Sequence, residues 1–128
     1  MDIELDINDL SSQIAGKLFE YGALDIQIIQ TQEKSKIAKR LVVCTAQDNQ
    51  AAKKMAIDLK EYFKTSIQSL HTDGIIKGEW VVIDYKDIIV HIFTKNARQK
   101  YNIEKLWKDS KNTIVVEPNQ LTIDNIVE

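Results

Sequence analysis

Two carboxylates beside a predicted turn are the side chains with the clearest capacity for chemistry. Asp84 and Asp87 flank the dipeptide Tyr85-Lys86. Paired carboxylates can hold Mg²⁺ or act as acid and base, as a nucleotidyltransferase would require. Such an enzyme would also place a Gly-Ser turn nearby to grip phosphates, and the sequence has no Gly-Ser dipeptide. We therefore favour a structural role, in which both carboxylates accept hydrogen bonds from backbone N–H groups of the turn.

Other catalytic and metal-binding patterns are absent from the sequence. The histidines are His71 and His91 and the single cysteine is Cys44, so soft ligands are too few for a zinc site and no intrachain disulfide can form. Cys44 lies in an apolar run and is expected to be a core residue. No phosphate-binding glycine loop and no nucleophile elbow occur. We expect no cofactor and no metal, and we predict a binding protein, not an enzyme.

The composition is typical of one folded domain in an aqueous, reducing compartment. The chain has 128 residues, of which 44% are hydrophobic and 28% are charged. The first ten residues carry four acids, unlike a signal peptide, and no apolar run approaches the ~20 residues of a membrane helix. We expect a single domain over residues 1–117, a loose tail over 118–128, a cytoplasmic location and no membrane contact.

Charge is unevenly distributed along the chain, although the net charge is only −2. Residues 1–30 carry six acids and one base, whereas residues 31–65 carry eight bases and four acids. An acidic region suits a basic partner, and a ribosomal protein is one such partner. Lys34, Lys36, Lys39 and Arg40 form a basic cluster that could contact RNA phosphates; the alternative is a solvated loop.

Hydrophobic periodicity predicts the helices that must position these residues. The first helix is expected from a cap at Asp6 or Asn8 to Gly22. The second is expected from a cap at Asp48 or Asn49 to about residue 64. Its apolar face would consist of Ala52, Met55, Ala56, Leu59 and Phe63. A third helix is predicted over residues 97–107.

That third helix would be capped by Thr94 or Asn96, and it would place Tyr101, Glu104 and Trp107 on one face because they are three residues apart.

Strands are predicted between these helices. The expected runs are residues 23–30, 41–45, a short strand over 66–71, 80–84, 88–93, and an edge strand over 114–116. Residues 72–78 are expected to form a loop, and residues 80–84 and 88–93 a tight hairpin. This order predicts an α+β domain with a mixed sheet flanked by helices.

The segment from Trp80 to Trp107 resembles the ribosomal silencing factor family, also called the Iojap-like family. The matching residues are Trp80, Asp84-Tyr85, Asp87, Val90-His91-Ile92-Phe93, Arg98, Tyr101, Glu104 and Leu106-Trp107. Residues 23–26, 35–38 and 41–45 are similar to the family more loosely. The chain departs from the family pattern at Lys39, at residues 46–48, and at Lys86. Lys86 replaces the glycine of the hairpin turn, and we expect it at positive φ.

The resemblance implies a fold, a partner and a mechanism. Family members have a nucleotidyltransferase-like topology without the catalytic site. They bind the large ribosomal subunit through its protein of the L-fourteen family, and they repress translation by blocking small-subunit joining. A large-subunit assembly adaptor is an alternative, and a divergent nucleotidyltransferase is a weaker one.

The resemblance also suggests which residues meet the partner. The partner-binding residues would be Trp80, Asp84, Tyr85, Asp87, Arg98, Tyr101, Glu104 and Trp107. His91 and Trp107 are the motif residues most readily assigned to packing instead. A monomer or a weak homodimer is expected, since residues 114–116 would leave a free sheet edge.

Overall fold

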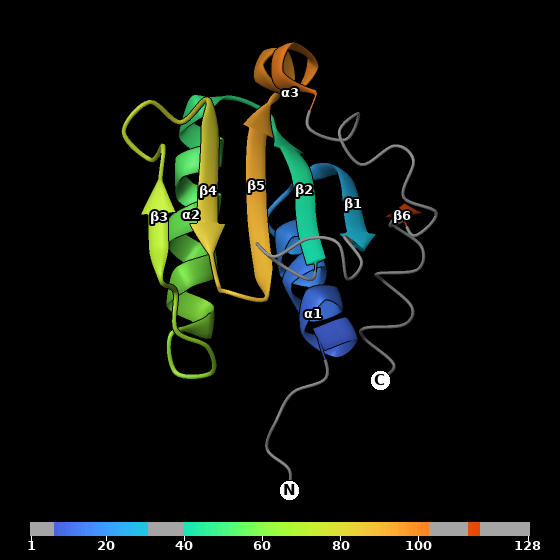
Figure 1. Cartoon of the computed structure of the whole chain (residues 1–128). Coiled ribbons are helices and arrows are strands. Elements are labelled where there is room, and N and C mark those ends of the chain that lie inside the picture. The colour runs from blue at the N-terminus through green and yellow to red at the C-terminus, as the bar shows by residue number, and fades with distance from the viewer. Residues whose placement is uncertain (1–6, 31–39, 103–112, 116–128) are drawn as a thin grey trace, which may run out of the picture.

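A six-stranded sheet organises the chain in the computed structural model, which describes residues 7–30, 40–102 and 113–115 (Figure 1). The strands are β1 (Leu24–Gln30), β2 (Arg40–Ala46), β3 (His71–Asp73), β4 (Trp80–Asp84), β5 (Ile88–Thr94) and β6 (Thr113–Val115). The helices are α1 (Ile7–Glu20), α2 (Asn49–Phe63) and α3 (Lys95–Tyr101). The strand order is β3-β4-β5-β2-β1-β6. β2 and β5 run parallel and the other neighbouring pairs run antiparallel, so the predicted α+β fold with a mixed sheet is confirmed.

The two faces of the sheet are covered differently. α1 and α2 lie on one face, behind the sheet in Figure 1. Side chains such as Val42 and Ile83 point toward these helices and form a large apolar core with them. The opposite face carries a smaller apolar cluster that includes Leu41 and Phe93. Because both faces of the central strands are apolar, β2 and β5 are buried almost throughout.

The end of α1 follows the prediction made from Gly22. The N–H of Ala23 donates to the Leu18 carbonyl at 2.9 Å, and the N–H of Gly22 donates to the Phe19 carbonyl at 3.0 Å. This pair of bonds is the Schellman arrangement, which satisfies the last carbonyls of a helix. Gly22 has a φ of +95°, which glycine adopts without a steric penalty.

The N-cap predicted at Asp48 is confirmed for α2, whereas the one considered at Asn8 is wrong for α1. Asp48 is the N-cap of α2, and its Oδ1 accepts a hydrogen bond from the N–H of Ala51 at 2.8 Å. α1 begins at Ile7, so Asn8 lies inside the helix and is not its cap, and Asp6 lies outside the described residues. The buried residues of α2 are those predicted: Ala52, Met55, Ala56, Leu59 and Phe63.

The prediction of a strand over residues 66–71 was wrong. The N–H groups of Ser66 and Ile67 both donate to the Phe63 carbonyl at 2.9 Å, so the chain continues turning after α2. The strand in this region is β3, which begins at His71, the last residue of the predicted strand. It continues through Thr72 and Asp73, which were expected to lie in a loop, and pairs with β4. A tight turn at the helix end displaced the strand along the sequence.

The β4–β5 hairpin is confirmed, including the backbone of its turn. Lys86 has a φ of +79°, as expected for a residue that replaces a glycine. Asp84 Oδ1 accepts a hydrogen bond from the Lys86 N–H at 2.7 Å, which confirms the structural role predicted for this carboxylate. Asp87 connects the hairpin turn to the start of β2 through its backbone, because its carbonyl accepts a hydrogen bond from the Arg40 N–H at 3.0 Å.

The third helix is shorter than predicted. The N-cap of α3 is Thr94, one of the two residues predicted for that position. The helix ends at Tyr101. Asn102 follows in the left-handed conformation, with a φ of +44°, which stops the helix. Glu104 and Trp107, which were predicted to share a helical face with Tyr101, lie outside the described residues, so that arrangement stays a prediction. None of the described helices is long and apolar enough to cross a membrane.

The last strand lies at the edge of the sheet, as predicted. β6 pairs antiparallel with β1, placing Ile114 opposite Ile28. It begins at Thr113, one residue before the predicted start. The tail predicted over residues 118–128 lies outside the described residues, and the domain boundary at residue 117 stays a prediction.

Candidate functional site

Four rings gather on the sheet face opposite α1 and α2, where β4, β5 and α3 meet. Trp80 lies opposite Phe93 in the strand register, so both side chains point to the same face. Their ring centroids are 5.0 Å apart, and the Tyr101 ring from α3 lies 4.6 Å from that of Trp80. The fourth ring, His91, lies 5.9 Å from Trp80. Residues spread over three elements thus form one aromatic cluster.

His91 serves this cluster as a hydrogen-bond acceptor. Trp80 Nε1 donates to His91 Nδ1 at 3.0 Å. Because Nδ1 accepts, the neutral ring carries its proton on Nε2. Burial lowers the pKa of His91 to about 4, which keeps the ring neutral near pH 7. The arrangement fits the packing role predicted for His91, since it orients Trp80.

Arg98 ties α3 to the sheet. Its Nη1 donates to Thr45 Oγ1 at 2.8 Å and also to the backbone carbonyl of Asp25. Asp25 has a φ of +49° and lies where the register of β1 shifts against β2. These bonds join α3 to both β1 and β2. Arg98 therefore positions α3, and with it Tyr101, and it is partly buried in doing so.

Tyr85 lies on the other side of the sheet from Trp80. Its side chain is only 6% exposed and belongs to the core between the sheet and the helices. Burial raises the pKa of Tyr85 to about 12, so its hydroxyl is protonated. A partner docked against Trp80 cannot reach a side chain in this position, so the aromatic anchors predicted from sequence lie on different faces.

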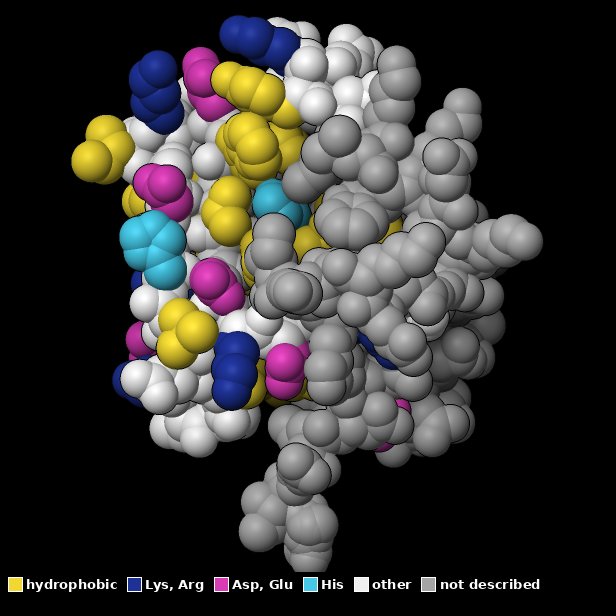
Figure 2. All heavy atoms as spheres, viewed as in Figure 1, with side chains coloured by type: hydrophobic (Ala, Val, Ile, Leu, Met, Phe, Trp, Pro, Cys, Tyr) yellow, Lys and Arg dark blue, Asp and Glu magenta, His cyan; other side chains and the backbone are white. Residues whose placement is uncertain are grey.

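Two acidic side chains border the aromatic cluster. Asp84 lies opposite His71 in the register, and Asp73 lies opposite Val82 on the strand that carries Trp80. Residues directly opposite each other share a face, so these acids flank the aromatic rings. Figure 2 shows hydrophobic side chains on this face with acidic ones beside them. We call Asp73, Trp80, Val82, Asp84 and Tyr101 the aromatic-acidic face.

The sequence patterns did not predict that Asp73 and Val82 belong to this face. Asp73 was expected in a loop, and only its pairing with β4 brings it beside the motif. Hairpin alternation could have found Val82, because it lies two residues from both Trp80 and Asp84.

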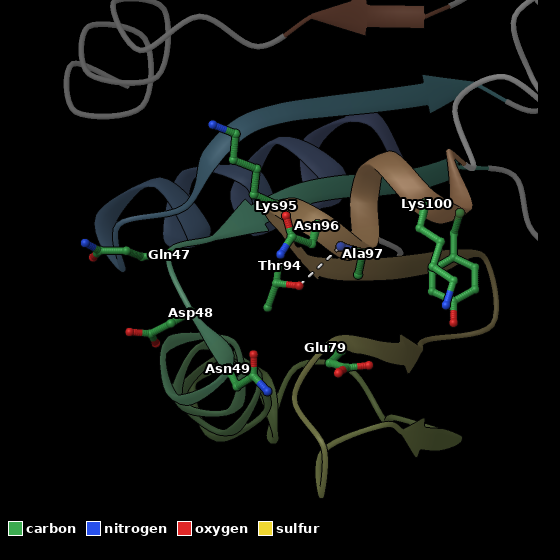
Figure 3. A pocket seen from close by; sticks show the side chains of 10 residues that line it. Gln47, Asp48, Asn49, Glu79, Thr94, Lys95, Asn96, Ala97 and Lys100 are labelled. Carbon is green, nitrogen blue, oxygen red and sulfur yellow. Dashed lines mark hydrogen bonds between the residues drawn. The ribbon is translucent and has the colours of Figure 1, made fainter.

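A pocket of about 470 Å³ lies at the start of α2 and α3, and Tyr101 of the aromatic-acidic face belongs to its lining (Figure 3). Its lining includes Gln47, Asn49, Glu79, Lys95, Asn96 and Lys100. Both helix starts are already capped, by Asp48 and Thr94, and the second bond is the dashed line in Figure 3. The pocket lies next to the first residue of β4, whereas Asp84 ends that strand, so the carboxylate pair weighed as catalytic is far from it.

Metal-ligating and nucleophilic groups are sparse in the described parts of the chain. Over residues 7–30, 40–102 and 113–115, no three His, Cys, Asp or Glu side chains form a group that could hold a metal ion. Cys44 is fully buried, and burial raises the pKa of its thiol to about 12. This confirms the prediction that Cys44 is a core residue, because a reactive thiol needs exposure and a lowered pKa.

Comparison with known proteins identifies the family. The sequence model described as "Ribosomal silencing factor during starvation" matches residues 5–126. This chain belongs to that family. The ribosomal silencing factor RsfS of Chromobacterium violaceum is 26% identical over 113 residues, which cover 88% of this chain and 93% of that protein. The protein of the same name from Bacillus subtilis is 30% identical over 89 residues, covering 69% and 75%.

Solved structures share the fold of this chain. A crystal structure of a Chromobacterium violaceum protein has a TM-score of 0.78 and 26% identity, covering 88% of this chain and 95% of that one. A Bacillus halodurans crystal structure has a TM-score of 0.73 at 24% identity, covering 85% and 99%, and shows the same fold. The family match over residues 5–126 confirms the resemblance carried by the motif from Trp80 to Trp107.

The structure divides the predicted partner-binding residues of this chain into three groups. Trp80, Asp84 and Tyr101 lie on the aromatic-acidic face. Tyr85 is buried on the helix side and Arg98 holds α3, while Asp87 lies partly exposed in the hairpin turn. Glu104 and Trp107 lie outside the described residues, as do Lys34, Lys36 and Lys39 of the basic cluster.

Proposed function

We propose that this chain binds the large ribosomal subunit through its ribosomal protein of the L-fourteen family and blocks small-subunit joining, which represses translation. Membership of the ribosomal silencing factor family is the observation that carries this proposal. The chain acts as a binding protein in the cytoplasm and needs no catalysis.

The aromatic-acidic face is the contact surface that we propose. Binding energy in protein interfaces concentrates in a few aromatic and charged anchors. Trp80 and Tyr101 supply two rings in tilted contact, and Tyr101 is 46% exposed. Asp73 and Asp84 flank them and suit a basic ribosomal protein, since complementary charge favours encounter and orientation. Tyr85 and Arg98 are left out, because the structure gives both a role inside the fold.

The mechanism is steric exclusion. A body of 14.7 kDa needs only to occupy a place that the small subunit must contact. A stable interface of this kind buries about 1,200–2,000 Å² in total.

Cosedimentation with separated ribosomal subunits is the direct test of binding. We expect the protein to pellet with large subunits and not with small ones, and to shift subunit mixtures on sucrose gradients away from joined particles. Failure to pellet with large subunits would overturn the proposal. Binding without any effect on the joining of mature subunits would instead favour the assembly adaptor.

Charge on the face is tested with Asp84→Asn. This change removes the negative charge and retains Oδ1 as the acceptor for the Lys86 N–H, so the turn is preserved. We expect weaker ribosome binding with unchanged stability. Calorimetry of the parent protein with a nucleoside triphosphate and Mg²⁺ is the companion experiment, and binding that Asp84→Asn abolishes would support the enzyme alternative.

A further inference from the structure

Three residues in register form a row across the sheet face that carries the aromatic cluster. Thr45 of β2 lies beside Phe93 of β5, and Phe93 lies opposite Trp80 of β4. Residues paired in this way share a face of the sheet, and α3 lies at this end of the sheet (Figure 1). Arg98 donates to Thr45 at one end of the row, and the Tyr101 ring contacts Trp80 at the other. The position of the Tyr101 ring is therefore linked to the bonds that Arg98 makes, three residues earlier on α3.

The helix α3 depends on such bonds because it is short. It has seven residues, and Ala97 is its buried residue. Isolated helices shorter than about 12–15 residues are marginal in water, so α3 must be held by its contacts with the sheet. Hydrogen bonds from a charged guanidinium are stronger than those between neutral groups. Arg98 therefore supplies an attachment that the packing of Ala97 does not provide.

The backbone of β1 is shaped to supply the second acceptor for Arg98. Asp25 has a φ of +49°, in the left-handed region that residues other than glycine adopt uncommonly. It lies within the register shift between Leu24 and Gln27, where the pairing of β1 with β2 is irregular. Such bulges re-aim nearby groups, and here the Asp25 carbonyl accepts a hydrogen bond from Arg98 Nη1. Asp25 is exposed, so its backbone conformation and not its carboxylate serves Arg98.

We propose that Thr45 and the bulged backbone at Asp25 position the partner-binding ring of Tyr101. Together they hold Arg98, which fixes α3 so that Tyr101 is in contact with Trp80 before the partner arrives. A surface that is already arranged for binding raises affinity, because the partner does not have to select a rare conformation. This inference rests on the proposed function, whereas the attachment of α3 can be measured in the free protein.

Nuclear Overhauser contacts between the Tyr101 and Trp80 rings report the position of α3 in the free full-length chain. Arg98→Met keeps an apolar stem and removes the donors, and Thr45→Val removes the acceptor from a side chain of similar size. Both variants should lose most of the ring contacts, whereas Thr45→Ser, which keeps the hydroxyl, should retain them. Ring contacts that persist unchanged in Arg98→Met would overturn the proposal, whether or not the protein binds ribosomes.

Cosedimentation with large ribosomal subunits measures the consequence for binding. We expect Arg98→Met to weaken binding about tenfold and Thr45→Val about threefold, while Thr45→Ser restores the parent affinity. Thr65→Val, at an exposed threonine after α2, is the matched control. In a Tyr101→Ala background, Arg98→Met should cost less than about a further twofold, because Arg98 acts through Tyr101. A full tenfold loss in that background would show that Arg98 meets the partner directly and would refute the positioning role.

Two substitutions at Asp25 separate the backbone from the side chain. Glycine adopts a positive φ freely, so Asp25→Gly should keep both the ring contacts and the subunit affinity. Valine is disfavoured at positive φ, so Asp25→Val should weaken both. Equal losses in the two variants would mean that the carboxylate is needed, which contradicts the backbone role. If the parent protein does not pellet with large subunits, the proposed function fails, and the ring contacts of the free variants still decide how α3 is attached.

Discussion

Trp80 and Tyr85 belong to the same hairpin and the same sequence motif, yet they lie on opposite sides of the sheet. Trp80 joins a partly exposed aromatic cluster with Tyr101 and two flanking acids. Tyr85 is buried among core residues next to α2. Side chains alternate between faces along a strand, so an odd spacing separates them. The comparison teaches that a shared motif combines residues for contact with residues for folding.

The largest effect is expected from Trp80→Ala. Trp80 is partly buried against Phe93, and its Nε1 donates a hydrogen bond to His91 Nδ1. Truncation should reduce the free energy of unfolding by about 3–5 kcal/mol, because a large aromatic contact and a hydrogen bond are lost. Urea unfolding measures this change. Trp80→Phe keeps most of the packing and serves as the control; a neutral Trp80→Ala would show that the cluster contributes little to the fold.

Acidification should weaken the same cluster through His91. The pKa of His91 is lowered from 6.5 to about 4 in the folded state. Between pH 6.5 and about pH 4, this histidine therefore binds a proton more readily in the unfolded chain than in the folded protein. The contribution is fully present above pH 6.5 and is lost as the pH falls to about 4, amounting to about 3 kcal/mol. We would measure unfolding free energies across this range and compare them with His91→Phe, which should lose this part of the slope. An identical slope in the variant would contradict the assignment.

Affinity for the large ribosomal subunit should depend on Tyr101 and not on the hydroxyl of Tyr85. Tyr101→Ala removes an exposed ring, so stability should change little while affinity for the large subunit falls about 30-fold, as for an interface anchor worth about 2 kcal/mol. Tyr85→Phe should leave that affinity unchanged. Tyr62→Ala, at an exposed tyrosine of α2, is the matched control for loss of an exposed ring. If Tyr62→Ala and Tyr101→Ala have equal effects, the aromatic-acidic face is not the docking surface.

The smallest effect concerns the turn that joins the two regions. Lys86→Gly should stabilise the protein by about 1 kcal/mol, because Lys86 has a φ of +79° that glycine adopts without a steric penalty. Thermal unfolding detects a change of this size. Asp87→Gly in the same turn should destabilise, because the described backbone has no positive φ at Asp87. Destabilisation by Lys86→Gly would mean that the Lys86 side chain makes a compensating contact.

Sequence patterns predicted the local features of this chain well. The cap at Asp48, the helix end at Gly22 and the positive φ of Lys86 were all anticipated, because each depends on a few neighbouring residues. The predictions of a strand over residues 66–71 and of a third helix reaching residue 107 were wrong. The local conformational preferences at those two boundaries were balanced and did not decide them. A turn after Phe63 and a left-handed Asn102 decided those boundaries.

By itself, the sequence determined the α+β class, the main elements and the family, since periodicity, turn chemistry and motif spacing are written along the chain. Only the tertiary structure decided which motif residues face outward. In the tertiary structure Asp73 lies opposite Val82, and Arg98 donates hydrogen bonds to Thr45 and to the Asp25 carbonyl. Tyr85 is buried beside α2. These contacts depend on strand register and on helix packing between distant segments, and register fixes the face of every side chain on a strand.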